Sequence, residues 1–86
     1  PWENQSMFTN KYVEKLSEAA GQAVSIPDED AILDFTRRVA HGSERKHAPL
    51  ATFLAGWFVA ARVADGVSPA DAWAEAARLG DDLLET

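Results

Sequence analysis

Apolar residues recur at helical spacing in four segments of the chain, and each segment is bounded by residues that start or stop helices. The first segment follows Thr9 and Asn10, which are good N-cap residues, and ends before Gly21, which suits a left-handed C-terminal cap. The pattern therefore predicts a helix that starts near residue 9. Its apolar stripe consists of Tyr12, Val13, Leu16, Ala19 and Ala20.

The second helix is predicted to begin at Pro27, which is followed by three acidic residues that favour a helix N-terminus. Arg37, Arg38 and His41 fall in its last turn, where cations stabilise the helix dipole. Gly42 is expected to end the helix. Its buried face is predicted to contain Ile32, Phe35, Thr36 and Val39.

The third helix is predicted from Pro49 to about Ala64, with Gly66 as its cap. Its large apolar residues are spread around the helix, so more than one face is expected to be covered. We therefore expect a central helix with four mostly buried side chains, Phe53, Leu54, Trp57 and Phe58.

The fourth helix opens with Ser68 as N-cap, Pro69 in the first turn and Asp71 at the capping-box position. No segment alternates apolar and polar residues as a strand would. The predicted fold is all-α, a small four-helix bundle with a buried central third helix. The apolar stripe of the fourth helix is Trp73, Ala76, Ala77, Gly80, Leu83 and Leu84.

The 86 residues are enough for one compact core. Residues 1–8 match no helical pattern and are expected to be disordered or added during cloning, whereas residues 9–86 are expected to form a single helical domain. The chain has no cysteine and no visible signal peptide, which predicts a cytoplasmic location.

Charge and hydropathy exclude two classes of partner. A net charge of -6 would repel phosphate over most of the surface, so nucleic-acid binding is not expected. The most apolar run, residues 48–64, is shorter than the ~20 residues that span a bilayer and contains Arg62, so membrane insertion is not expected either.

The two histidines and nearby hydroxyl groups are the candidates for metal binding or catalysis. His41 and His47 are separated by a loop and match no zinc-binding spacing. Ser43 or Thr52 could be paired with His41 as nucleophile and base, but nothing in the sequence fixes that geometry. We expect no metal site and no catalytic residue.

Basic residues gather where the second and third helices meet. Residues 37–47 carry a formal charge of +3, whereas the rest of the chain carries -9. Arg45 and Lys46 do not complement a helix dipole, and they directly precede the N-terminus of the third helix. Such a corner suits a phosphate, a carboxylate or an acidic protein surface, and the alternative is a solvated loop. The candidate binding residues are Arg37, Arg38, His41, Gly42, Arg45, Lys46, His47 and Pro49.

The same region carries a resemblance to a known family. Residues 11–84 resemble a small uncharacterised helical domain found mainly in actinobacteria. This domain occurs alone or joined to a molybdenum-cofactor guanylyltransferase-like domain, and the stand-alone form is often encoded beside a formate dehydrogenase and the sulfur-transfer protein that activates its cofactor. The most specific part is the motif Val39-Ala40-His41-Gly42, followed by Ala48-Pro49-Leu50 and Phe53-Leu54-Ala55-Gly56.

The resemblance implies a non-catalytic accessory protein or small subunit of a molybdenum-dependent formate dehydrogenase or molybdenum-cofactor system. The implied partner is the formate dehydrogenase catalytic subunit or a cofactor-maturation protein, docked at the basic corner. No cofactor is expected to be bound by the chain itself, and the link to the molybdenum cofactor is indirect. The alternative is a carrier or small enzyme that binds a phosphate-bearing ligand, such as a molybdopterin nucleotide, at the same corner.

Overall fold

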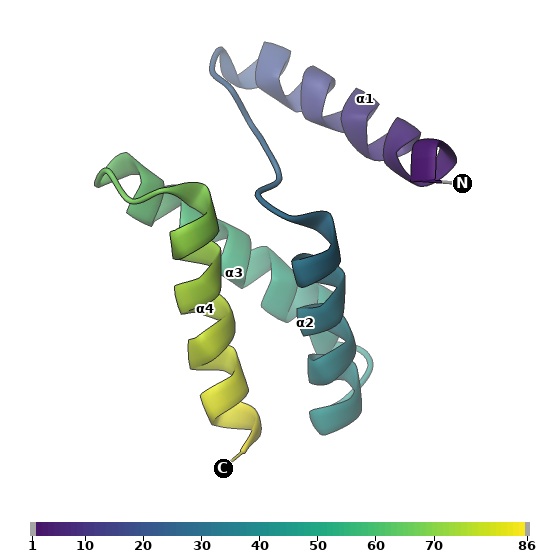
Figure 1. Cartoon of the computed structure of the whole chain (residues 1–86), viewed down its shortest axis with the longest axis vertical. Helices are drawn as coiled ribbons and strands as arrows, with labels where there is room; N and C mark the ends of the chain where they lie inside the picture. The colour runs from purple at the N-terminus through teal and green to yellow at the C-terminus, as the bar shows by residue number, and fades with distance from the viewer. Residues whose placement is uncertain (1, 86) are drawn as a thin grey trace.

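The computed structural model describes the backbone of residues 2–85 and the side chains of residues 7–85. Within these limits the chain forms four α-helices and no strand (Figure 1). The helices are α1 (Trp2–Ala20), α2 (Glu29–Gly42), α3 (His47–Ala64) and α4 (Pro69–Leu84). The predicted fold class, a small all-α four-helix fold, is confirmed. None of the four helices is long and apolar enough to cross a membrane.

Helix α3 crosses behind α2 and α4 and holds the three-helix core together (Figure 1). It packs against both α2 and α4, which also contact each other. Within the described residues α1 packs against none of the other helices, and Figure 1 shows it apart from them at the end of an extended segment, residues 21–28. Helix α1 is therefore attached to the other three helices through a linker and not through a shared core.

Two aromatic side chains and a set of small residues make the core. Phe35 on α2 is 3% exposed and meets Trp73 on α4 edge to face, with ring centroids 5.6 Å apart. This geometry is the one that aromatic quadrupoles favour. The other buried residues are small, which allows the three helices to approach closely. They are Val39, Ala48, Ala55, Ala72 and Ala76.

The side of α3 that faces away from α2 and α4 is exposed. Four large side chains on it are between 61 and 67% exposed, and we call them the outer face of α3: Leu50, Phe53, Leu54 and Trp57. The prediction that the last three are mostly buried is wrong, because α2 and α4 cover only the opposite side of the helix, around Ala48 and Ala55. Phe58 lies at the edge of the core and is half-buried. Leu83, predicted in the buried stripe of α4, is also exposed.

The outer face of α3 carries no charge. The charged residue within α3 is Arg62, and it lies on the covered side, where its Nε donates a hydrogen bond of 3.2 Å to Glu75 Oε1 of α4. A helix that is apolar all round is normally buried on all sides. In this chain the outer face of α3 is exposed, because α2 and α4 pack only on the opposite side of the helix.

The N-terminal caps follow the sequence closely. Ser68 Oγ accepts a hydrogen bond of 3.1 Å from the Asp71 amide at the start of α4, as predicted. At α2 the cap is Asp28, whose Oδ1 accepts a 3.1 Å bond from Ala31, so Pro27 lies outside the helix and not in its first turn.

Two helices begin earlier than the pattern predicts. Helix α3 begins at His47 and not at Pro49, because a turn through residues 44–46 already supplies the first carbonyl acceptors. Helix α1 begins at Trp2, so the boundary predicted at residue 9 falls inside it. Residues 2–8 contain no glycine or proline, and extending an existing helix costs little. Pro1, the remaining residue of the predicted N-terminal segment, lies outside the described residues.

Two hydrogen bonds between Ser17 and Val24, which we call the Ser17 bracket, fix the angle between α1 and the linker. Gly21 adopts a φ of +73° and its amide bonds to the Ser17 carbonyl at 3.0 Å, as a left-handed cap does. Ser17 Oγ then accepts a bond of 2.9 Å from the Val24 amide and donates one of 3.4 Å to the Val24 carbonyl. The turn between α1 and the linker is therefore held by three hydrogen bonds.

Gly80 on α4 is required for the approach of α4 to Phe35. A Cβ at Gly80 would lie 2.7 Å from Phe35 Cε1, and Phe35 is fixed by its contact with Trp73. We expect Gly80→Ala to lower the free energy of unfolding by roughly 1–2 kcal/mol, because overpacking outweighs the better helix propensity of alanine. Urea denaturation at one protein concentration measures this.

Gly56→Ala is the matched control. Gly56 also lies inside a helix, but nothing lies within 4 Å of the added Cβ. This variant should be more stable than wild type by roughly 0.5–1 kcal/mol. Equal shifts for the two variants would contradict the close packing at Gly80.

Candidate functional site

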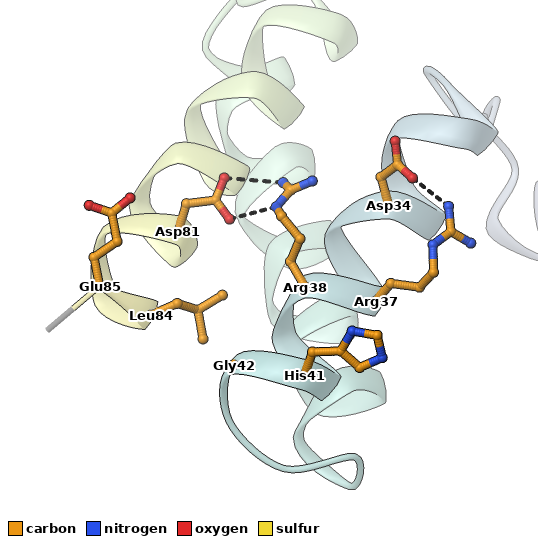
Figure 2. Close-up of a pocket in the computed structure, with 8 residues that line it drawn as sticks. All are labelled: Asp34, Arg37, Arg38, His41, Gly42, Asp81, Leu84 and Glu85. Carbon is orange, nitrogen blue, oxygen red and sulfur yellow. Dashed lines mark hydrogen bonds and ion pairs between the residues drawn. The ribbon is translucent and has the colours of Figure 1, made fainter.

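An open hollow of about 670 Å³ lies between the C-terminal halves of α2 and α4 (Figure 2). Both helices place their last turns there because they run side by side beside α3. Residues four apart on α2 face the same direction, which brings Arg38 and Gly42 to the hollow together. The hollow is lined by Asp34, Arg37, Arg38, His41, Gly42, Asp81, Leu84 and Glu85.

Arg38 is held in place by two partners, the carboxylate of Asp81 and the ring of Phe35. Its Nε and Nη2 donate hydrogen bonds of 2.9 and 3.1 Å to the two carboxylate oxygens of Asp81. This two-bond arrangement is the strong form of an arginine–carboxylate pair. The guanidinium carbon also lies 5.8 Å from the centroid of the Phe35 ring.

The pKa of Arg38 is raised above its ordinary value. The hydrogen bond to Asp81 is the largest cause, and the charges of Asp81 and Asp34 act in the same direction, against a smaller opposing effect of burial. Arg38 therefore stays charged, and its function in the described structure is to join α2 to α4.

The other charged residues of the hollow balance one another. Arg37 forms an ion pair with Asp34, one turn earlier on α2. Glu85 adds a third carboxylate to the lining. Two guanidinium groups thus meet three carboxylates, so the local excess of positive charge counted along the sequence is absent from the hollow. The carboxylates of Asp81 and Glu85 reach it from α4, far along the chain.

Gly42 ends α2, as predicted, and it also makes room for α4. It is the last residue of α2, and positive φ values in the described chain occur at Gly21 and Gly66. A Cβ on Gly42 would lie 3.2 Å from Leu84 Cδ2. Gly42 therefore allows the end of α4 to pack against the end of α2.

The remaining predicted residues lie on the turn after α2, outside the hollow. Lys46 Nζ lies 3.8 Å from Glu44 Oε1, and both side chains are well exposed. His47 Nδ1 and Ser43 Oγ share a hydrogen bond of 2.6 Å that closes the turn. Arg45 is exposed, and no ion pair involving it is seen within residues 2–85.

The predicted residues therefore divide into two groups. Arg37, Arg38, His41 and Gly42 share the hollow, whereas the others occupy the turn and the start of α3. Pro49 is exposed in the first turn of α3. No hydrogen bond between Asp34 and His41 is seen among the described residues, and no group of three potential metal ligands occurs there.

The model of one protein family matches the chain over residues 4–86, and its description is "Domain of unknown function (DUF6457)". The chain belongs to this family. No curated protein and no solved structure matches the chain. The DUF6457 match includes α2, α3 and α4 completely and α1 from residue 4 onward, so the hollow and the outer face of α3 both belong to the family's domain.

The sequence pattern did not indicate Asp81, Leu84 and Glu85 as parts of the hollow, nor the outer face of α3 as an exposed surface. The helical spacing of Asp81, Leu84 and Glu85 places them on neighbouring positions of α4. This spacing does not show that the shared side of α4 lies beside α2, which depends on the packing of the two helices. The outer face had no such signal, because a helix with a single charged residue is expected to be covered on all sides.

Proposed function

We propose that this DUF6457 protein is a non-catalytic accessory protein or small subunit that works in an assembly with other protein chains. Association with another chain is supported most strongly by the outer face of α3, where four large apolar side chains and no charge are exposed, and docking of a foreign partner is supported by the exposed charges of the corner. Contiguous apolar patches of several hundred Å² on a soluble domain mark interaction sites. In a single chain the outer face of α3 is exposed to solvent.

The docking surface for a foreign protein is the corner formed by the end of α2, the turn and the start of α3. Arg37, Arg45 and Lys46 are exposed there, and carboxylates are interspersed with them. Interspersed charges of both signs suit a protein surface with complementary charges. They suit a free phosphate less well, because Asp81 and Glu85 would repel it.

The identity of the partner comes from the resemblance described above. It implies the catalytic subunit of a molybdenum-dependent formate dehydrogenase or a cofactor-maturation protein, in the cytoplasm. His41 and Gly42 belong both to that motif and to the hollow. The alternative, a carrier for a molybdopterin nucleotide at the same corner, has less support because the two arginines of the hollow already bind carboxylates.

Charge reversal at the corner tests the proposal. We expect Arg45→Glu with Lys46→Glu to change the free energy of unfolding by less than about 0.5 kcal/mol, because both side chains are exposed. Retention of the formate dehydrogenase subunit or maturation protein from a native extract should fall roughly tenfold, and molybdenum in the eluate should fall with it. Mass spectrometry of the eluate measures the retained partner, and metal analysis measures the molybdenum.

The matched control reverses the same amount of charge elsewhere. Lys11→Glu with Lys15→Glu changes two exposed cations on α1, away from the corner, and should leave retention at the wild-type level. Equal retention by both double variants would exclude the corner as the docking surface. Saturable binding of a molybdopterin nucleotide to the isolated protein would favour the carrier instead.

A further inference from the structure

We infer that the outer face of α3 is covered by α1 of a second copy of this chain, and that two copies exchange α1 reciprocally. This rests on the proposed function only in that both treat the chain as part of an assembly. The foreign partner docks at the corner of α2 and α3, whereas the exchange uses the outer face of α3. The two surfaces meet at Pro49 and Leu50, but the residues varied in the two tests are different, so the two proposals can fail or succeed separately.

Helix α1 carries an apolar stripe that its own chain leaves uncovered. Phe8, Tyr12 and Leu16 recur every four residues, and with Met7 beside them they are 38–72% exposed. Lys11 and Lys15 border this stripe, because they follow Phe8 by three and seven residues, whereas Glu14 lies on the opposite side of the helix. An isolated amphipathic helix of this kind is marginal in water and is normally stabilised by packing of its apolar side.

The stripe on α1 and the outer face of α3 match each other in chemistry. Each is a largely apolar helical surface about two to three turns long; the outer face of α3 has no charged side chain within it, and the α1 stripe is bordered by Lys11 and Lys15. Helices pack by placing such ridges into each other's grooves. One chain thus offers one donor helix and one acceptor face, which is the arrangement that a closed two-fold dimer requires.

The area is sufficient for a stable dimer. Four side chains about two-thirds exposed, at roughly 200 Å² each, offer roughly 500 Å² on α3, and the α1 stripe offers roughly 400 Å². Two reciprocal contacts therefore bury roughly 1,800 Å², which lies within the standard range for stable protein interfaces. Direct packing of two α3 outer faces would bury only about half as much and would leave both α1 stripes exposed.

The turn between α1 and the linker favours a second copy over the same chain. The Ser17 bracket to Val24 and the left-handed Gly21 direct α1 away from its own α3. Linker residues, among them Val24, line a hollow on the flank of α3 beside Gly56 and Ala60. Folding α1 back onto its own chain would require either breaking the Ser17–Val24 hydrogen bonds or moving Val24 away from the flank of α3, whereas exchange with a second copy keeps both.

The first test is the mass of the protein in solution. Sedimentation or light scattering of wild type should give twice the 9.4 kDa chain mass, with dissociation on dilution. Trp57→Glu and Tyr12→Glu should each weaken the dimer roughly 100-fold or more, because each places a charge in the centre of both contacts. Circular dichroism should show that both variants keep the helices of the core, α2, α3 and α4, with at most the contribution of α1 lost. Leu83→Glu, on an exposed leucine of α4 outside both surfaces, should remain a dimer.

Mixing the two variants distinguishes exchange from other dimers. A mixed dimer of Trp57→Glu and Tyr12→Glu contains one intact contact, formed by the normal α1 of the first and the normal α3 of the second. An equimolar mixture should therefore associate at concentrations at which each variant alone is monomeric.

Three results would overturn the inference. A monomeric wild type would mean that α3 is covered by its own α1 or by another protein. A Tyr12→Glu variant that stays dimeric would mean that two α3 faces pack directly. A mixture that does not associate would exclude reciprocal exchange. A monomeric protein that still retains the formate dehydrogenase partner would leave the proposed function intact.

Discussion

Replacing Phe35 with alanine should remove roughly half of the protein's free energy of unfolding. Phe35 is the largest side chain of α2 in the core, and it contacts Trp73, approaches Gly80 and lies beneath the guanidinium of Arg38. Truncating a buried phenylalanine costs about 3–5 kcal/mol, and a domain of this size has a total stability of roughly 5–10 kcal/mol. Urea denaturation, followed by the helical circular dichroism signal, measures the loss in free energy of unfolding.

The matched control is Phe53→Ala, which removes the same atoms from the outer face of α3. At 66% exposure Phe53 contributes little to the core of a single chain. We expect a loss below about 1 kcal/mol when the protein is dilute enough to be monomeric. The sequence pattern predicts the opposite, since it places Phe53 in the core. Equal melting of the two variants would contradict the arrangement of α2, α3 and α4 described above.

Most of the fold could be predicted because local signals determine it. The N-cap at Ser68 and the left-handed conformations at Gly21 and Gly66 each depend on a few neighbouring residues. The buried residues of α2, Phe35 and Val39, follow from helical periodicity, because that helix has a clear polar side.

The exposure of α3 could not be predicted in the same way. Its sequence is apolar on all sides, so periodicity cannot say which side α2 and α4 cover. The answer depends on the position of α1, which the Ser17 bracket directs away. The pattern counted α1 as part of one bundle, whereas the described chain leaves the outer face open.

The candidate site was predicted in part. The sequence pointed to the end of α2, and Arg37, Arg38 and His41 do lie at one hollow. Its charge was misjudged, because a count along residues 37–47 omits the partner of Arg38, which lies 43 residues away at Asp81. Charges that are separate in sequence are combined by the packing of α2 on α4, which only the fold supplies.

The close approach of α4 to the core makes Ala72 the second sensitive position. Ala72 is 0% exposed, so a larger side chain at this position has no solvent to enter. We expect Ala72→Leu to lower the free energy of unfolding by roughly 2–3 kcal/mol, because overpacked cores force side chains from their rotamers and helices apart. Displacement of α4 should also weaken the contact of Trp73 with Phe35, and urea denaturation with near-ultraviolet circular dichroism measures both effects.

Ala74→Leu is the control for Ala72→Leu, since it adds the same atoms on the same helix at an exposed residue beside an open hollow. It should change the stability by less than about 0.5 kcal/mol.

The same displacement of α4 in Ala72→Leu should separate Asp81 from Arg38, because that ion pair joins the ends of α4 and α2. Retention of the foreign partner should therefore fall in Ala72→Leu and not in Ala74→Leu. A stable Ala72→Leu protein with wild-type retention would show that α4 has room to move, and that the corner does not depend on its position.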